Sequence, residues 1–460
     1  MSLQTLGKCL LCMAWMVLSG CVVSPQRPYV QSRAASAVCE AKRTVEPSKR
    51  TPESPVDNSY TLHFVEFDDQ GWLFPDGADP VHPEGTPSKQ IDCAVADLAG
   101  QLSAGQQVLS FVYVHGWKHS ADHDDPDVKR FRELLGSRAK LFPGRQIVGI
   151  YVGWQGRTVD LPLLKELTFW GRKNAANHVA EGRVRELFSR IKGLRDYWNG
   201  PREGLNRTQD CDWEPTGEDK CSLRTIMIGH SFGGLILYNS AAPYLLEMLS
   251  ATRDIPAGLE PAKARRARGI ADLIVLLNPA FEGSRYESLY QASQHYQPSG
   301  REPPILVMIT STADLATKNA FPVARWFNSI FQYPSSSDDE SEAMRRTPGH
   351  TDRYLTHDLC VENADCRAID PEAGSETGKP WSGSRRFCGG LILRRFSSAP
   401  FGDKSIVWNV RTNGEIIRNH SDIVGKYVFR FVEQVYGDVA GTSNTACLDS
   451  YRSPSSDAED

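Results

Sequence analysis

The stretch LRTIMIGHSFGGLILYNSA, from Leu223 to Ala241, decides the fold. Its first apolar run predicts a buried strand, the glycine-rich centre predicts a sharp turn, and the second apolar run predicts a helix. Gly229 and Gly233 lie two residues on either side of Ser231, which is the G-x-S-x-G spacing that raises a serine hydroxyl above the edge of a sheet. We therefore expect Ser231 to be a nucleophile, and the alternative is a purely structural glycine-rich turn.

A serine nucleophile needs a base, because its hydroxyl is a weak nucleophile by itself. The expected base is His420, in the block NHSDI between the last predicted strand and the last predicted helix. His350 and His357 precede that strand and fit less well. The alternative for His420 is a structural role beside Ser421 at the start of the helix.

The base in turn needs a carboxylate that orients it. Asp314 is the expected acid, because it lies just past the apolar run that ends at Ile309. Glu282, after the preceding predicted strand, and Asp422 are the competing candidates.

A third requirement is a pair of N–H donors for the negative oxygen that forms during acyl transfer. The block FVYVHGW ends a predicted strand upstream of the serine, and the backbone N–H groups of Trp117 and Phe232 are the candidates. Gly116 would let this loop approach the substrate closely. We expect His115 to shape the loop and not to act as the base.

Histidines and acids spaced by four residues near His115 raise the alternative of a metal site. Such spacing aligns side chains only on a helix, and Gly116 directly after a strand argues against a helix there. We therefore expect no metal site and no cofactor. The residues concerned are His115, His119, His123, Asp122, Asp124 and Asp125.

The central part of the chain alternates between two kinds of apolar pattern. Continuous β-branched runs predict strands over 60–67, 108–117, 146–154, 223–231, 270–280, 303–312 and 405–411. Amphipathic runs predict helices over 90–102, 127–139, 177–191, 232–249 and 422–436. This order predicts an α/β domain over 59–438, with a mostly parallel sheet covered by helices on both faces and an insertion around 325–400.

The blocks VHGW, GHSFGG and NHSDI, with Ser, Asp and His in that chain order, resemble the α/β-hydrolases. The resemblance is greatest to poorly characterised bacterial serine hydrolases, and it covers about residues 60–436. It implies an esterase or lipase-like enzyme that acts on a small ester or a lipid-like substrate through an acyl-enzyme. The alternatives are a non-catalytic binding protein with this fold, and a peptidase or acyltransferase that uses the same three residues. The aromatic residues Phe169, Trp170, Trp326, Phe327, Phe331 and Tyr333 are either core residues or the lining of an acyl pocket.

The N-terminus predicts export. Lys8 is followed by an apolar run from Cys9 to Leu18, about half the ~20 residues that a membrane-spanning helix needs, so residues 1–20 read as a signal peptide. Leu18-Ser19-Gly20-Cys21 resembles a bacterial lipobox, which implies lipid on Cys21 and a membrane anchor. Val22 follows in place of an Asp, so the resemblance implies the outer membrane. The alternative is an ordinary secreted protein.

Export to an oxidising compartment predicts disulfides. Cys211 with Cys221 and Cys360 with Cys366 are close enough in sequence to close small loops. Cys39 with Cys93 and Cys388 with Cys447 follow only by elimination.

Composition excludes one class of partner and predicts two segments without a core. The net charge of −4 gives no electrostatic basis for binding nucleic acid. Residues 21–58 are rich in Ser, Pro, Arg and Lys and predict a flexible tether, and residues 439–460 predict a disordered tail. Nothing in the sequence predicts an oligomeric state.

Overall fold

The computed structural model describes twelve parts of the chain. They are residues 42–45, 59–76, 86–156, 165–200, 221–250, 269–296, 303–322, 337–362, 366, 385–396, 406–423 and 425–439. The signal peptide, Cys21 and residues 440–460 of the predicted tail lie outside them.

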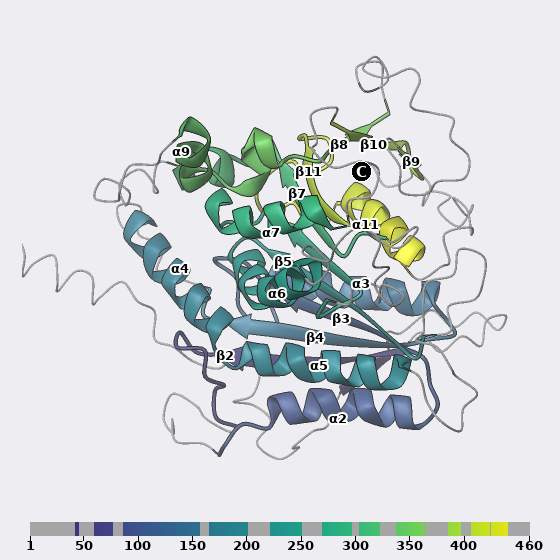
Figure 1. Cartoon of the computed structure of the whole chain (residues 1–460). Coiled ribbons are helices and arrows are strands. Elements are labelled where there is room, and N and C mark those ends of the chain that lie inside the picture. Colours follow the sequence, from purple (N-terminus) through teal and green to yellow (C-terminus); the bar gives the residue numbers. More distant parts are fainter. Residues whose placement is uncertain are drawn as a thin grey trace, which may run out of the picture.

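The described residues form an 11-stranded sheet in the order β1-β2-β4-β3-β5-β6-β7-β11-β8-β10-β9 (Figure 1). Neighbouring strands from β2 to β8 are parallel, and β1, β10 and β9 pair antiparallel. Every residue of β3 and of β5 is buried, which explains their continuous apolar runs. The strands are β1 Lys42–Val45, β2 Ser59–Phe67, β3 Val108–Val114, β4 Gln146–Trp154, β5 Leu223–His230, β6 Leu273–Leu277, β7 Leu306–Ser311, β8 His357–Val361, β9 Arg385–Phe387, β10 Leu391–Arg395 and β11 Val407–Thr412.

Helices cover both faces of this sheet, as the sequence predicts (Figure 1). One apolar core lies under α2 Gln90–Ser103, α4 Lys165–Glu181, α5 Val184–Asn199, α6 Phe232–Ser250 and α7 Gly283–His295. A second core lies under α3 Pro126–Leu141 and α11 Lys426–Val439 on the other face. The architecture is therefore α/β, with a mostly parallel sheet.

Residues 177–191 are helical as predicted except at Gly182 and Arg183, where two helices meet in place of the single predicted helix. α4 ends at Glu181 and α5 starts at Val184. Between them Gly182 packs against Gly71 so closely that a Cβ on Gly182 would lie 2.6 Å from the Gly71 carbonyl oxygen. That carbonyl accepts a hydrogen bond from Arg183 N at 3.0 Å. A contact with a residue more than a hundred positions away therefore breaks the helix.

The predicted insertion around 325–400 adds secondary structure to the edge of the sheet. Its described part contains α9 Asp338–Arg345, two short 3₁₀ turns at Pro348–His350 and Asp352–Tyr354, and the strands β8, β10 and β9. β8 joins β11 in parallel, while β10 and β9 continue the sheet antiparallel. The insertion is thus part of the fold and extends the sheet beyond β11.

The structure describes both cysteines of one predicted disulfide pair and one cysteine of each of the other three. Cys360 and Cys366 are bonded, as predicted. Cys93, Cys221 and Cys388 are disulfide-bonded as well. Their predicted partners Cys39, Cys211 and Cys447 lie outside the described residues.

The predicted tether contains one strand, because Lys42–Val45 forms β1 and pairs with Ser59–Leu62 of β2. The other residues of 21–58 lie outside the described parts. In the parts that the structure describes, none of the helices combines the length and the apolar character needed to cross a bilayer.

The turn after β5 gives a test of this packing. A Cβ on Gly233 would lie 2.5 Å from the His115 carbonyl oxygen, and closer still to that of Val114, whereas a Cβ on Gly193 in α5 would meet nothing within 4 Å. In urea denaturation we expect Gly233→Ala to lower the free energy of unfolding by at least about 2 kcal/mol. Gly193→Ala should raise it by about 0.5–1 kcal/mol. Equal stability of Gly233→Ala and the wild type would contradict the close contact of α6 with β3.

Candidate active site

Ser231 occupies the turn between β5 and α6 in a left-handed backbone conformation, with φ of 54°. This conformation is strained for a residue other than glycine, and the surrounding structure must enforce it. Two backbone hydrogen bonds do so: Ser231 N donates to Leu277 O at 3.0 Å, and Ser231 O accepts from Ala280 N at 3.1 Å. Ser231 is therefore fastened to the end of the neighbouring strand, β6.

The structure brings Ser231, His420 and Asp314 together. His420 Nε2 lies 2.8 Å from Ser231 Oγ, and His420 Nδ1 lies 2.8 Å from Asp314 Oδ2. An ionised carboxylate only accepts hydrogen bonds, so Nδ1 carries the proton and Nε2 offers its lone pair to the serine hydroxyl. The imidazole thus has the tautomer that a general base requires.

Asp314 remains ionised although it is fully buried. Burial alone would raise its pKa, but hydrogen bonds from His420 and Thr317 lower the pKa below its ordinary value. Its oxygens accept from Thr317 Oγ1 at 2.7 Å, from Ala316 N at 2.9 Å and from Thr317 N at 3.3 Å. These donors come from the turn after β7, so the local chain stabilises the negative charge.

The competing acids are engaged elsewhere. Glu282 is buried between Lys173 and Arg285, and its Oε2 lies 2.9 Å from Arg285 Nε. Asp422 is half-buried, and its Oδ2 lies 2.9 Å from Nε of the exposed Arg418. Asp314 is the carboxylate that reaches His420.

The competing histidines also have other partners. His350 Nε2 lies 3.1 Å from Thr317 Oγ1, behind Asp314, and burial lowers the pKa of His350 to about 4. His357 is buried against the ring of Trp408, with ring centroids 4.8 Å apart. Neither histidine is hydrogen-bonded to Ser231.

The expected oxyanion donors, the backbone N–H groups of Phe232 and Trp117, belong to the turn of Ser231 and to the loop after β3. Phe232 is the first residue of α6, where backbone N–H groups have no acceptor within the helix. The loop after β3 passes so close that a Cβ on Gly116 would lie 3.0 Å from Ser231 Cβ. Trp117 follows directly, and its ring centroid lies 6.3 Å from that of Phe232. Gly116 therefore permits the approach that the sequence predicts.

His115 holds this loop against β4. Its Nδ1 lies 2.9 Å from Gly116 O and its Nε2 accepts from Trp154 N at 3.1 Å, so both ring nitrogens are used. Trp154 Nε1 donates to His115 O at 2.9 Å. The structure thus gives His115 the loop-shaping place that the sequence predicts.

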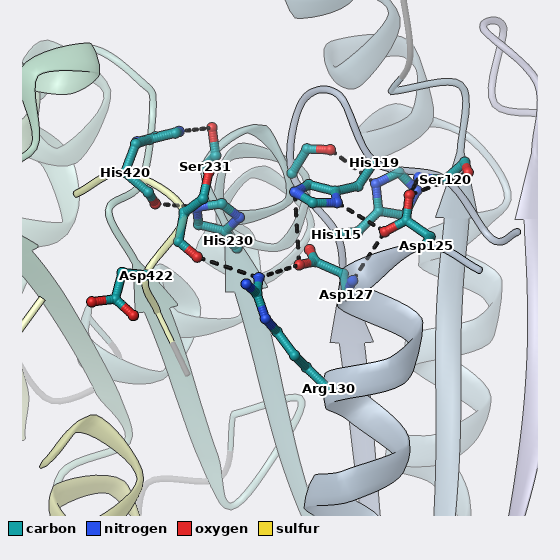
Figure 2. A network of polar contacts seen from close by, with 12 residues as sticks. His115, His119, Ser120, Asp125, Asp127, Arg130, His230, Ser231, His420 and Asp422 are labelled. Carbon is teal, nitrogen blue, oxygen red and sulfur yellow. Dashed lines mark hydrogen bonds and ion pairs between the residues drawn. The ribbon is translucent and has the colours of Figure 1, made fainter. Parts of the chain in front are cut away.

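Sequence reasoning missed two residues that contact the backbone carbonyl oxygen of His420. His230 Nε2 lies 2.8 Å from His420 O (Figure 2). Asn278 Nδ2 lies 3.3 Å from the same oxygen. His230 stands inside the quoted motif, next to Ser231, and Asn278 ends the apolar run of β6. Both are polar residues at the end of a buried strand, and that pattern in the sequence could have marked them as candidates for the site.

The described residues that come nearest to a metal-binding arrangement are His119, Asp125 and Asp127, whose ligand atoms lie within 4.8 Å of one another. These three residues do not depend on the four-residue helical spacing considered for the sequence, because the loop before α3 brings His119 next to the two acids. Protein groups already engage them: Asp125 accepts from His119 Nδ1 at 2.8 Å and from the backbone N–H groups of Ser120 and Asp127 at 3.0 Å each. Asp125 therefore caps α3, which accounts for the cluster without an ion.

An aromatic cluster lies beside the turn. Phe169 of α4 packs on Phe232 with ring centroids 5.1 Å apart, on Trp117 at 5.7 Å and on Phe321 at 6.1 Å. Phe169 and Trp170 are half-buried. The other aromatic candidates, Trp326, Phe327, Phe331 and Tyr333, lie outside the described residues.

Comparisons of the chain with protein-family models, with curated proteins and with solved structures gave no match.

The loop of His115 predicts a pH dependence of stability. Burial lowers the pKa of His115 from 6.5 to about 4, so between these values the unfolded chain binds a proton that the folded chain does not. The stability that depends on neutral His115 is complete above pH 6.5 and is lost as the pH falls towards 4. His115→Asn, which keeps a donor near Gly116 O, should flatten the pH dependence of the unfolding free energy in this interval by about 1.4 kcal/mol per pH unit. Denaturation curves of both proteins at several pH values test this, and identical slopes would contradict it.

Proposed function

We propose that the chain is a serine hydrolase of the α/β-hydrolase type that cleaves a carboxylic ester. The observation that carries the proposal is the continuous hydrogen-bonded series Ser231–His420–Asp314, with 2.8 Å at each step. Its members follow the ends of three parallel strands, β5, β7 and β11, in the chain order Ser, Asp, His. In parallel α/β sheets this edge is where ligands bind, and this chain order is that of the α/β-hydrolases.

In the first half of the reaction, Ser231 Oγ attacks the acyl carbon while its proton passes to His420 Nε2. The carbonyl oxygen becomes negative and accepts hydrogen bonds from the N–H groups of Phe232 and Trp117, each worth about 10²–10³-fold in rate. The bond to the alcohol oxygen then breaks, and His420 gives its proton to that oxygen. The product is an acyl-enzyme at Ser231.

In the second half, water attacks the acyl-enzyme and His420 takes a proton from it. The tetrahedral intermediate expels Ser231 Oγ, which regains a proton from His420, and the carboxylic acid leaves. The imidazole is positively charged in both halves, and ionised Asp314 stabilises that charge because its pKa stays low.

The strained turn favours a catalytic function over binding alone. Ser231 keeps a left-handed backbone that costs on the order of 1–3 kcal/mol, and strain of this kind clusters at functional sites. Peptidases and acyltransferases share the machinery, so activity on esters, on amides and with alcohol acceptors has to be compared directly.

The nucleophile is tested with a fluorophosphonate probe, which forms an Oγ–P bond with loss of fluoride. We expect the wild type to be labelled by the probe and to hydrolyse p-nitrophenyl acetate. Ser231→Ala should show neither labelling nor ester hydrolysis. Ser189→Ala is the matched control, because Ser189 Oγ is hydrogen-bonded to Tyr244 OH in α6 and not to the site. This variant should keep wild-type labelling and ester hydrolysis. Full labelling of Ser231→Ala would refute this nucleophile.

We also propose that lipid on Cys21 anchors the protein to the bacterial outer membrane. The support is the lipobox-like Leu18-Ser19-Gly20-Cys21 with Val22 after it. Two or more acyl chains, at about 0.8 kcal/mol per buried CH₂, hold a protein at a membrane for long times.

Metabolic labelling tests the anchor. We expect the wild type expressed in bacteria to incorporate labelled palmitate and to sediment with outer membranes. Cys21→Ser should lose the label and enter the soluble fraction, whereas Cys12→Ser, inside the predicted signal peptide, should behave as the wild type. Palmitate on Cys21→Ser would contradict the assignment.

A further inference from the structure

The backbone carbonyl of His420 is held by two side chains from separate strands. His230, the last residue of β5, places Nε2 at 2.8 Å from this oxygen (Figure 2). Asn278, directly after β6, places Nδ2 at 3.3 Å from the same oxygen. A carbonyl oxygen has two lone pairs and accepts both. The main chain of His420 is thereby tied to the two strands on which the turn of Ser231 is built.

The contact fixes the protonation of His230. A carbonyl only accepts, so Nε2 carries the proton and Nδ1 does not. Within the described residues Nδ1 has no hydrogen-bond partner, and the His230 residue is 1% exposed. Gly116 packs beside it, because a Cβ there would lie 2.7 Å from Nδ1. Burial, and then the nearby His420, lower the pKa of His230 well below its ordinary value.

The neutral state of His230 matters for its neighbour. The ring centroids of His230 and His420 are 5.0 Å apart, and those of His230 and His119 are 6.4 Å apart. Burial would lower the pKa of His119, but Asp125 and Asp127 raise it. Figure 2 shows His230 between these two histidines. His420 becomes a positively charged imidazolium during acyl transfer. A neutral His230 ring places no positive charge beside it that would repel this imidazolium.

Asn278 is held in one orientation by its own contacts. It is fully buried, its φ is 43°, and asparagine tolerates this left-handed conformation better than most residues. Its Oδ1 accepts from Ser311 N at 3.0 Å, so Nδ2 is the atom that faces His420 O.

Other donors hold neighbouring carbonyls of the same loop. Arg130 Nη1 lies 3.4 Å from Asp127 Oδ1 (Figure 2) and 3.4 Å from Ser421 O. Ser311 Oγ donates to Ile417 O at 2.7 Å. His230 and Asn278 differ from these because they act on the residue that carries the imidazole. A shift of this main chain moves Nε2 relative to Ser231 and Nδ1 relative to Asp314 together.

We propose that His230 and Asn278 are positioning residues, which set the main chain of His420 so that its ring spans Ser231 and Asp314. This inference rests on the proposed hydrolase function. Sites of this kind need their groups held within about 0.5 Å, so losing a donor should slow the chemical step more than it weakens substrate binding.

The test compares His230→Phe, which keeps a ring but has no donor, with His230→Gln, whose side-chain amide nitrogen reaches about as far as Nε2. With p-nitrophenyl acetate we expect His230→Phe to lower kcat by about 10–100-fold with KM within about twofold. His230→Gln should restore most of the loss, and fluorophosphonate labelling rates at Ser231 should follow the same order. Asn278→Asp keeps the acceptor for Ser311 N, places an oxygen against His420 O, and should lower kcat similarly.

His357→Phe is the matched control, because His357 is also buried and its pKa is lowered to about 3 by burial. It should lose stability but keep kcat. Wild-type kcat and labelling rates in His230→Phe and in Asn278→Asp, or no recovery in His230→Gln, would overturn the positioning role while the hydrolase function stands. A wild type with neither labelling nor ester turnover would instead overturn the proposed function and this inference with it.

Discussion

The site depends on the left-handed backbone of Ser231. Its φ of 54° is unfavourable by itself and persists because Leu277 O and Ala280 N hold the turn from β6. The same turn starts α6 at Phe232, and the first N–H groups of a helix have no acceptor within that helix. One backbone constraint therefore orients the serine and one of its expected oxyanion donors together.

Each remaining group approaches this turn from a different strand end. Gly116 brings the loop after β3 against Ser231, the turn after β7 carries Asp314, and the loop after β11 carries His420. Because these strands are parallel, their carboxyl ends meet at one edge of the sheet, and residues far apart in sequence converge there. Buried hydrogen bonds then complete the arrangement: Thr317 supports Asp314, while His230 and Asn278 hold His420.

The sequence predicted the sheet, the helices on both of its faces and the convergence of Ser231, Asp314 and His420, because strand ends and chain order determine these. It did not predict the break at Gly182, since that depends on a contact with Gly71. It also did not predict β8, β9 and β10, whose short runs carry little periodicity and which are strands because they extend an existing edge. Asn278 was missed because its importance depends on facing a carbonyl 142 residues later in the chain.

A crystal structure of the fluorophosphonate adduct tests the central claim most directly. If the turn of Ser231 presents its hydroxyl to His420 and to the N–H groups of Phe232 and Trp117, phosphorus will be bonded to Ser231 Oγ. One phosphoryl oxygen will then lie about 2.7–3.1 Å from both nitrogens. An adduct on another residue, or a phosphoryl oxygen that points away from both N–H groups, would contradict the account.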